Sequence, residues 1–271
     1  MDEIVVTAED LRKEFRIRGR REPLRAVDGV TFTIARGESL ALVGESGSGK
    51  STVANMVMGL TKPTSGAVRL LGMPDSFDMR RAADRRRRAS FIQLVFQDPY
   101  SSLDPRQRVG DALAEVIRLH DPTAVTAVPA RVDALLTDVG LDPALATALP
   151  RSLSGGQRQR VAIARALAAD PDVLVLDEAV SALDVTVQAQ VLRLLDRIRR
   201  DKHVSYLFIS HDLAVVSEVS DRVLVMSKGT VVEEGETRAV LTQPQHPYTR
   251  ALVASVPRPG WRPKDALRAS A

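Results

Sequence analysis

The chain has 271 residues, of which 44% are hydrophobic and 27% charged, so its composition is that of a globular protein rather than a disordered one. It contains no cysteine, which excludes disulfides, thiolate zinc sites, cysteine-ligated iron–sulfur clusters and cysteine nucleophiles. No apolar run approaches the roughly 18 residues that cross a bilayer, and the acidic start lacks the pattern of a secretory signal. These features favour a cytosolic chain with one main domain.

The net charge is +4, and the basic residues are spread along the chain among nearly as many acidic ones. A nucleic-acid-binding protein more often concentrates its basic residues on one face. The densest cluster contains Arg80, Arg81 and the run from Arg85 to Arg88. We expect a solvated helix or loop surface there. The alternatives are docking to an acidic partner and contact with anionic headgroups or nucleic acid.

Short β-rich runs and amphipathic stretches follow one another along the chain. They predict strands at residues 4–6, 30–34, 39–43, 68–71, 91–96, 173–176, 206–210, 222–226 and 230–233. They predict helices at residues 50–59, 109–119, 131–139, 155–168 and 187–199. The alternation of strands and helices indicates a mainly parallel sheet, and the first strands, polar at alternate positions, indicate an antiparallel one. We expect a helical insertion at about residues 100–148 and an irregular, proline-containing tail after Glu236.

Residues 44–51 read GESGSGKS and lie between the strand expected at 39–43 and the helix that follows. This is the phosphate-loop pattern, in which glycines let backbone N–H groups turn inward and the helix N-terminus adds its positive dipole end. We expect Lys50 to reach the β- and γ-phosphates and Ser51 to hold Mg²⁺. The residues expected around the phosphates are Gly44, Glu45, Ser46, Gly47, Ser48, Gly49, Lys50, Ser51 and Thr52.

A second candidate site follows the apolar run VLVLDE at residues 173–178. Two consecutive acids at the end of a buried strand are unfavourable unless they have a ligand. Asp177 fits a partner of Mg²⁺, directly or through water, and Glu178 could polarise an attacking water as general base. The alternative is that these acids cap a helix.

The segment LSGGQ at 153–157 opens another expected helix, with Ser154 as N-cap and the N–H groups of Gly155 and Gly156 left for an anion. A second anion-binding helix start is useful only if each start faces a different ligand or subunit. At this point the sequence resembles the ATP-binding subunits of ABC transporters, from about residue 3 to residue 257. The resemblance implies a P-loop NTPase fold of ABC type. Its α/β core has a mainly parallel sheet, with an antiparallel β subdomain and a helical subdomain at about 98–165.

The resemblance also assigns roles to single residues. Phe15 matches an aromatic residue that stacks on adenine, and Gln97, in VFQDP, matches a glutamine that senses Mg²⁺ and the γ-phosphate. LSGGQ, including Gln157, is the family signature. Asp184, in SALD, matches a loop that links the two sites of a dimer, and His211, in FISHD, matches a histidine that contacts the γ-phosphate.

These roles imply a mechanism with two chains arranged head to tail. Lys50 and Ser51 of one chain would face Ser154 and Gly156 of the other across ATP. ATP binding would close the dimer and hydrolysis would let it open, which is a ligand-driven shift between two states. The helical region after Gln97 would dock on cytoplasmic loops of membrane subunits and transmit the closure.

Several segments resemble the peptide and nickel importer branch of the family; they are residues 97–106, 181–195, 206–216 and 246–257, the last within a tail at 236–271. In that branch two related ATPases pair at the cytoplasmic face of the membrane, beneath two permease subunits and an extracellular solute-binding protein. We therefore expect an ATPase that energises import of oligopeptides, dipeptides or a related small solute. Ala179 stands where many relatives have proline, but this departure removes no reactive group.

Other functions stay open. The chain could serve a nickel, metallophore or other-solute transporter, or an exporter, because other subunits select the solute. A soluble ABC ATPase acting on nucleic acid or ribosomes would normally carry two nucleotide domains or a long coiled coil, and this sequence shows neither, so we expect no nucleic-acid partner. A binding module without turnover is disfavoured by the intact Glu178 and His211.

Overall fold

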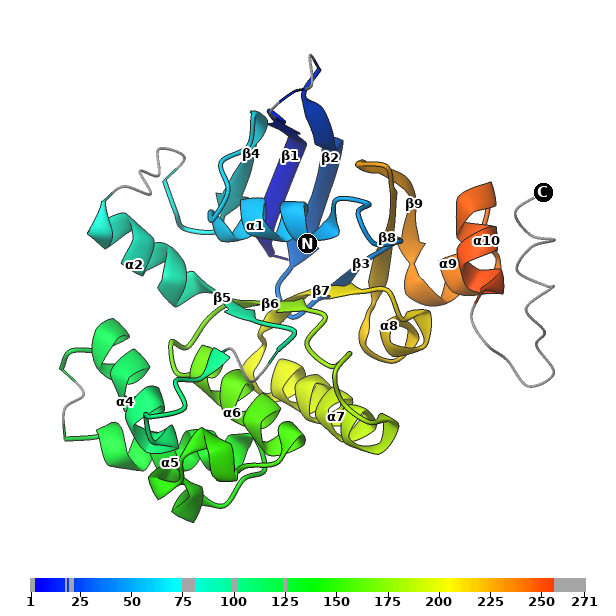
Figure 1. Cartoon of the computed structure of the whole chain (residues 1–271). Coiled ribbons are helices and arrows are strands. Elements are labelled where there is room, and N and C mark those ends of the chain that lie inside the picture. Colours follow the sequence, from blue (N-terminus) through cyan, green and yellow to red (C-terminus); the bar gives the residue numbers. More distant parts are fainter. Residues whose placement is uncertain are drawn as a thin grey trace. The chain divides into compact units, whose positions relative to one another are not determined.

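The computed structural model of the chain describes residues 3–17, 19, 22–74, 81–98, 102–123 and 126–255. The chain divides into two compact units, one formed by Met1–Asp75 with Tyr206–Ala271 and the other by Ser76–Ser205. Figure 1 labels the helices and strands of both. Within the described ranges, no helix combines the length and the apolar character that crossing a membrane requires.

The first unit begins with an antiparallel sheet. It contains β1 (Ile4–Phe15), β2 (Leu24–Ala35) and β4 (Ser65–Leu70) in the order β2-β1-β4, with β1 antiparallel to both neighbours. The antiparallel pairing is as expected, but β1 and β2 are much longer than the apolar runs that predicted them. The charged halves of the two strands pair through their backbones, with Arg12 bridging Asp10 and Asp28 on the exposed face and Leu11 and Val27 buried.

In the second sheet of this unit, β3 (Ser39–Val43) lies between β7 (Ser205–Ser210) and β8 (Arg222–Ser227) and runs parallel to both. The strand β9 (Thr230–Glu236) pairs antiparallel with β8. Every residue of β3 and β7 is buried, as their almost wholly apolar sequences predict. The helices of the unit are α1 (Lys50–Met58), α8 (Leu213–Val219), α9 (Thr237–Thr242) and α10 (Pro247–Ala254).

The tail is more regular than its prolines suggest. The expectation of an irregular segment after Glu236 is wrong for its described part, which contains α9 and α10 in contact with each other. Proline is compatible with the first helical position, where its missing N–H would have no intrahelical partner, and Pro247 occupies this position in α10. The tail prolines at 257, 259 and 263 lie outside the described residues.

The second unit combines a parallel strand pair with helices. The pair is β5 (Ile92–Val95) and β6 (Val173–Asp177). Among its described residues, the helices are α2 (Ala82–Phe91), α4 (Val109–His120), α5 (Val128–Asp138), α6 (Gly155–Leu167) and α7 (Val185–Lys202), with short 3-10 turns at Pro143–Thr147 and Pro150–Ser152. Helices α4, α5 and α6 pack against one another, and Leu113, Ile117 and Leu136 are buried. Helices α4 and α5 lie within residues 100–148, where helices are expected from the sequence.

Helix α2 carries the arginine cluster. Because this helix extends to Phe91, β5 begins later than the strand expected at 91–96. Arg86 and its two neighbours in the run are exposed, as expected for a solvated face. Arg88 contradicts that expectation: it is 7% exposed, and burial lowers its pKa to about 10. It lies one helical turn before the buried Phe91 and so shares the inward face of α2. Arg80 lies outside the described residues.

Candidate functional site

The phosphate loop leaves β3 directly and ends in α1. Gly44 and Gly49 have φ angles of 147° and 107°. A Cβ atom at Gly44 would lie 2.2 Å from the carbonyl oxygen of Met226, and one at Gly49 would lie 2.5 Å from that of Ala26. Only glycine meets both requirements, of conformation and of space. The ends of the loop are therefore fixed against the backbones of β8 and β2.

The start of α1 has the character of an anion site. Gly49 is its N-cap, and among the described residues no side chain caps this end. The first N–H groups of an α-helix have no intrahelical acceptor, and the positive end of the helix dipole lies beside them. Ser51 is exposed at this helix start and Thr52 is half-buried. The local geometry suits a phosphate group, as the motif predicts.

Lys50 lies inside the loop rather than in solvent. Its side chain belongs to a residue that is only 6% exposed, and its Nζ donates to the carbonyl oxygens of Gly44 at 2.7 Å and Glu45 at 2.8 Å. A weaker contact of 3.4 Å joins it to Ser48 Oγ. The loop therefore holds a cation at its centre on acceptors that phosphate oxygens could replace.

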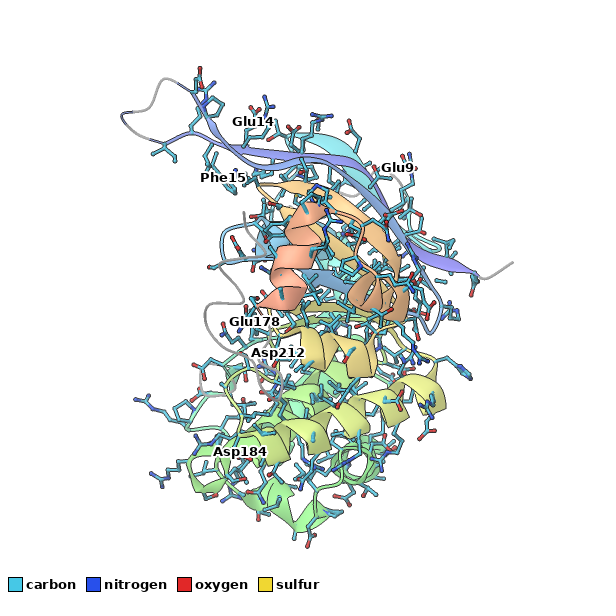
Figure 2. The ribbon with its side chains drawn as sticks, turned by 90° about the vertical axis from the view of Figure 1, so that its right-hand side faces the viewer. Glu9, Glu14, Phe15, Glu178, Asp184 and Asp212 are labelled. Carbon is cyan, nitrogen blue, oxygen red and sulfur yellow. The ribbon has the colours of Figure 1, made fainter. Side chains whose placement is uncertain are left out.

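His211 reaches the same sheet edge as the phosphate loop. Strands β3 and β7 are parallel, with Val43 opposite Ser210, so Gly44 and His211 both follow the carboxyl ends of neighbouring strands. Ligands of open α/β sheets bind beyond that edge. The exposed His211 precedes Asp212, labelled in Figure 2, which caps α8 by accepting the backbone N–H of Ala214 at 2.9 Å.

Phe15, at the end of β1, also belongs to the first unit (Figure 2). It is 41% exposed, and the ammonium of Lys13 lies 5.1 Å from the centroid of its ring. A cation at this distance is attracted by the π-system of the ring. An accessible aromatic ring beside a cation is chemically suited to stack on a nucleobase.

The acidic pair belongs to the second unit. Strands β5 and β6 are parallel, with Val95 opposite Leu176. Gln97 therefore follows the carboxyl end of β5, and Asp177 is the last residue of the neighbouring β6. The Nε2 of Gln97 donates to Ser181 Oγ at 3.3 Å, and that hydroxyl donates to the carbonyl oxygen of Glu178 at 2.9 Å. Ser181 thus joins Gln97 to the backbone of Glu178. It was not among the expected site residues, although the segment SALD that contains it was.

Glu178 has a φ angle of 49°, a left-handed conformation that non-glycine residues rarely adopt and that is common at functional sites. Asp177 and Glu178 are both half-buried. Asp177 and Glu178 do not cap α7, the helix that follows them. Its N-cap is Asp184, whose side chain accepts the N–H of Val187 at 3.0 Å. Glu178 and Asp184 are both labelled in Figure 2.

The start of α6 forms a reciprocal capping box. Ser154 Oγ accepts the N–H of Gln157 at 3.2 Å, while the side chain of Gln157 accepts the N–H of Ser154 at 2.9 Å. This confirms Ser154 as the N-cap and shows that both side chains are already engaged within the helix start. A Cβ atom at Gly156 would lie 2.5 Å from a methyl group of Val187, so this turn packs closely against α7.

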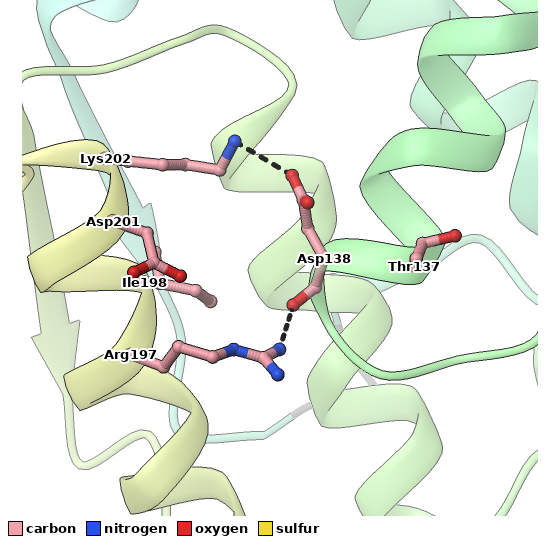
Figure 3. Close-up of a pocket in the computed structure, with 6 residues that line it drawn as sticks. All are labelled: Thr137, Asp138, Arg197, Ile198, Asp201 and Lys202. Atoms are coloured by element: carbon pink, nitrogen blue, oxygen red, sulfur yellow. Dashed lines mark hydrogen bonds and ion pairs between the residues drawn. The ribbon is translucent and has the colours of Figure 1, made fainter.

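A separate pocket of about 310 Å³ lies in the second unit, where the end of α5 meets the last turns of α7 (Figure 3). Lys202 forms an ion pair of 2.8 Å with the carboxylate of Asp138, and Arg197 donates to the carbonyl oxygen of the same residue. All six residues drawn in Figure 3 are outside the expected site. The pocket therefore adds no group to it.

One contact in the first unit was missed by sequence reasoning. The hydroxyl of Tyr248, on α10, accepts the backbone N–H of Glu45 in the phosphate loop at 3.0 Å. The residue belongs to the tail segment at 246–257, whose resemblance to the importer branch does not by itself predict a contact with the phosphate loop. The run HPYT at its start was the signal that could have pointed to it.

Two family descriptions match the chain: "ABC transporter" at residues 27–181 and "Oligopeptide/dipeptide transporter, C-terminal region" at residues 232–270. A putative peptide import ATP-binding protein of Brucella abortus (strain 2308) is 49% identical over 262 residues, covering 94% of this chain and 78% of that protein. The glutathione import ATP-binding protein GsiA of Escherichia coli (strain K12) is 48% identical over 254 residues, covering 93% of this chain and 40% of that protein.

Solved structures agree with these matches. The cbiO1 protein of Clostridium perfringens, part of an ABC transporter complex, has a TM-score of 0.78 at 28% identity and covers 89% of this chain and 92% of its own. A dimeric ATP-binding cassette in a post-hydrolysis state, bound to ADP and Pi, has a TM-score of 0.74 at 28% identity and covers 86% and 99%. They confirm the expected α/β fold of ABC type. The chain belongs to the ABC transporter family, as an ATP-hydrolysing cassette.

Proposed function

We propose that this ATPase energises the import of oligopeptides, dipeptides or a related small solute. The observation that carries the proposal is the match of residues 232–270 to the C-terminal region of oligopeptide/dipeptide transporters, in a chain that also has a complete phosphate loop. The Brucella relative, similar along most of both chains, is named as a peptide import protein, which supports the same solute class.

In the first unit, Phe15 would stack on adenine and the residues from Gly44 to Thr52 would surround the phosphates. Lys50 would exchange the carbonyl oxygens of the loop for phosphate oxygens, since its ammonium already lies at the centre of the loop. His211 would contact the γ-phosphate. The shared sheet edge of the loop and this histidine supports that role.

In the second unit, Glu178 would act as general base on the attacking water, and Gln97 would report the state of the γ-phosphate. The hydrogen bonds through Ser181 support a link between these two residues. The signature residues Ser154, Gly155, Gly156 and Gln157, with Asp184, would face the ATP of a second ATPase chain. The dimeric state of a similar cassette supports pairing with a second copy of this chain or a related one, and we propose that the pair is head to tail.

Magnesium is the ion that the proposed donors fit. They are the exposed hydroxyl of Ser51, the half-buried carboxylate of Asp177 and the amide oxygen of Gln97, whose amide nitrogen donates to Ser181. All three are hard oxygen donors, and Mg²⁺ is usually held by one or two protein oxygens together with nucleotide phosphates. A bound ion would neutralise charge that develops on the transferred phosphoryl group.

The proposed partners are two membrane permease subunits and an extracellular solute-binding protein, at the cytoplasmic face of the membrane. The proposed nucleotide-binding domain spans residues 3–257, with a helical subdomain at about 98–165 that would dock on the permeases and a tail at 236–271. No nucleic-acid partner is part of the proposal.

Affinity purification of the full chain from membranes, followed by identification of the co-purifying subunits, tests the proposal. We expect two permeases and a solute-binding protein, and ATPase activity of the complex that rises when a dipeptide or oligopeptide is added. The Glu178→Gln chain should purify with the same subunits and show no stimulation. A binding protein that responds only to a nickel chelate would replace peptide import by the metallophore alternative, and co-purification with ribosomes would contradict import.

A further inference from the structure

The tail helix α10 contacts the phosphate loop of its own chain. The hydroxyl of Tyr248 accepts the backbone N–H of Glu45 at 3.0 Å, although the two residues are 203 positions apart in sequence. Both belong to the first unit. Tyr248 is half-buried, and burial together with the nearby Glu45 carboxylate raises the pKa of its phenol, so the hydroxyl is neutral at physiological pH.

The position of Tyr248 is set by contacts at the start of α10. Its backbone N–H donates to the Nδ1 of His246 at 3.2 Å, which caps the helix. The N–H groups of Gln245 and His246 donate to the two carboxylate oxygens of Glu233, on β9, at 2.8 and 2.9 Å. Partial burial acts to raise the pKa of Glu233, but the hydrogen bonds that its carboxylate accepts and the charge of the nearby His246 together hold the pKa below its usual value.

This anchor connects the tail to the strand that precedes the phosphate loop. Strand β9, which carries Glu233, pairs with β8, and β8 pairs with β3, whose last residue Val43 precedes Gly44. Tyr248 is therefore held on the same sheet from which the loop emerges. The contact with Glu45 therefore joins α10, which Glu233 anchors to the sheet, to the phosphate loop, which follows β3 of the same sheet.

Glu45 is held on both sides. Its N–H donates to Tyr248, and its carbonyl oxygen accepts the ammonium of Lys50 at 2.8 Å. When phosphate oxygens replace the loop carbonyls around Lys50, the second of these bonds is given up and the first remains. A glycine-bounded loop loses much conformational entropy when it is ordered, and a bond made before the nucleotide arrives reduces that loss at the binding step.

We propose that Tyr248 is a positioning residue of the nucleotide site, whose hydroxyl keeps the phosphate loop in the conformation that accepts ATP. The tail is then a functional part of the nucleotide site of its own chain. This inference rests on the proposed role of the phosphate loop in binding ATP. It adds to that role a residue that touches the loop backbone and acts through it.

Tyr248→Phe in the full chain removes the hydroxyl and keeps the ring. We expect faster hydrogen exchange at the Glu45 amide and about two- to tenfold weaker ATP affinity by calorimetry, the range of one ordinary hydrogen bond, with a melting temperature lowered by no more than about 4 °C. Arg250→Ala, an exposed change on the same helix, is the matched control and should alter neither quantity. Glu233→Gln should weaken ATP binding in the same direction, because it loosens the anchor of α10.

Three results would overturn the inference: wild-type ATP affinity in Tyr248→Phe with unchanged exchange at Glu45, wild-type affinity with faster exchange, and a lower melting temperature with unchanged affinity. The last would assign Tyr248 a structural role only. Lys50→Met, measured in parallel, separates this outcome from failure of the proposed function. If that variant loses ATP while Tyr248→Phe does not, the phosphate loop keeps its role and only the inference about the tail fails.

Discussion

Replacing Lys50 by methionine removes the ammonium from the centre of the phosphate loop and leaves a side chain of similar length. In the structure this ammonium is almost inaccessible to solvent and donates to two loop carbonyls, at 2.7 and 2.8 Å. In the proposed role of Lys50, those bonds are exchanged for bonds to phosphate oxygens when ATP binds. The effect on affinity is therefore the difference between the two sets of interactions and not the full strength of either.

A pair of opposite charges about 4 Å apart contributes about 4 kcal/mol at an effective dielectric constant of about 20. The hydrogen bonds that the ammonium gives up within the loop are charge-assisted, and one such bond contributes about 1.5–3 kcal/mol. Two such bonds are given up, about 3–6 kcal/mol in all, and ion pairs with both the β- and the γ-phosphate contribute about 8 kcal/mol. The difference is at least about 2 kcal/mol, which corresponds to a roughly 30-fold or larger increase in the Kd for ATP in the Lys50→Met chain.

Titration calorimetry of the full chain with ATP measures this change directly. Lys62→Met is the matched control, because Lys62 is exposed and its backbone carbonyl, not its side chain, accepts the contact from Lys13. We expect wild-type affinity in the control. An ATP affinity within about twofold of wild type for Lys50→Met would refute the assignment of this ammonium to the phosphates, since about 0.4 kcal/mol is too little for an ion pair in a closed loop.

Three further predictions concern other parts of the molecule. Glu178→Gln should keep ATP binding and abolish steady-state hydrolysis, because an amide cannot take a proton from water; near-normal turnover would remove Glu178 from the role of base. Arg86→Glu, on the exposed face of α2, should change the free energy of unfolding by less than about 0.5 kcal/mol, whereas Arg88→Glu should lower it by about 3 kcal/mol or more; equal urea midpoints for the two variants would contradict the inward position of Arg88. The folded-state pKa of Glu233 lies below the ordinary value of 4.5, so its stabilisation is present above that pH and is lost as the pH falls through the lowered pKa. The difference in melting temperature between wild type and Glu233→Gln should therefore be full at pH 7 and shrink under acid; a difference that grows on acidification would reverse the assigned direction.

The phosphate loop could be read from sequence because all of its determinants are local. The apolar run at 39–43, the glycines and the helix start that follows lie within twenty residues, and each constrains the next. The same is true of Ser154, whose capping partner Gln157 is three residues away. In both places the structure has the elements where the pattern predicts them.

The features that sequence reasoning missed depend on partners far along the chain. The second half of β1 is polar, and its pairing is visible only when Arg12 meets Asp28 on the neighbouring strand. Arg88 has the same side chain as the arginines before it. Only the packing of α2 shows that Arg88 lies on the buried face of the helix and its neighbours on the exposed face. Prolines in a tail normally indicate irregular structure, but here His246 is the N-cap of α10 and Pro247 is the first residue of the helix.

The loop that looks self-contained in sequence is thus completed by three distant segments of the first unit. The carbonyl oxygens of Ala26 and Met226 leave no room for a side chain at Gly49 and Gly44, respectively. The hydroxyl of Tyr248 accepts the backbone N–H of Glu45, which lies between these glycines. Two of these contacts are steric and act through backbone, so a side-chain change at Ala26 or Met226 cannot remove them. Tyr248 is the contact that a single side-chain substitution can delete, and it belongs to the tail rather than to residues 27–181 that match the ABC transporter description. Variation in the tail can therefore alter how ATP is bound while the phosphate loop and the strands around it stay the same.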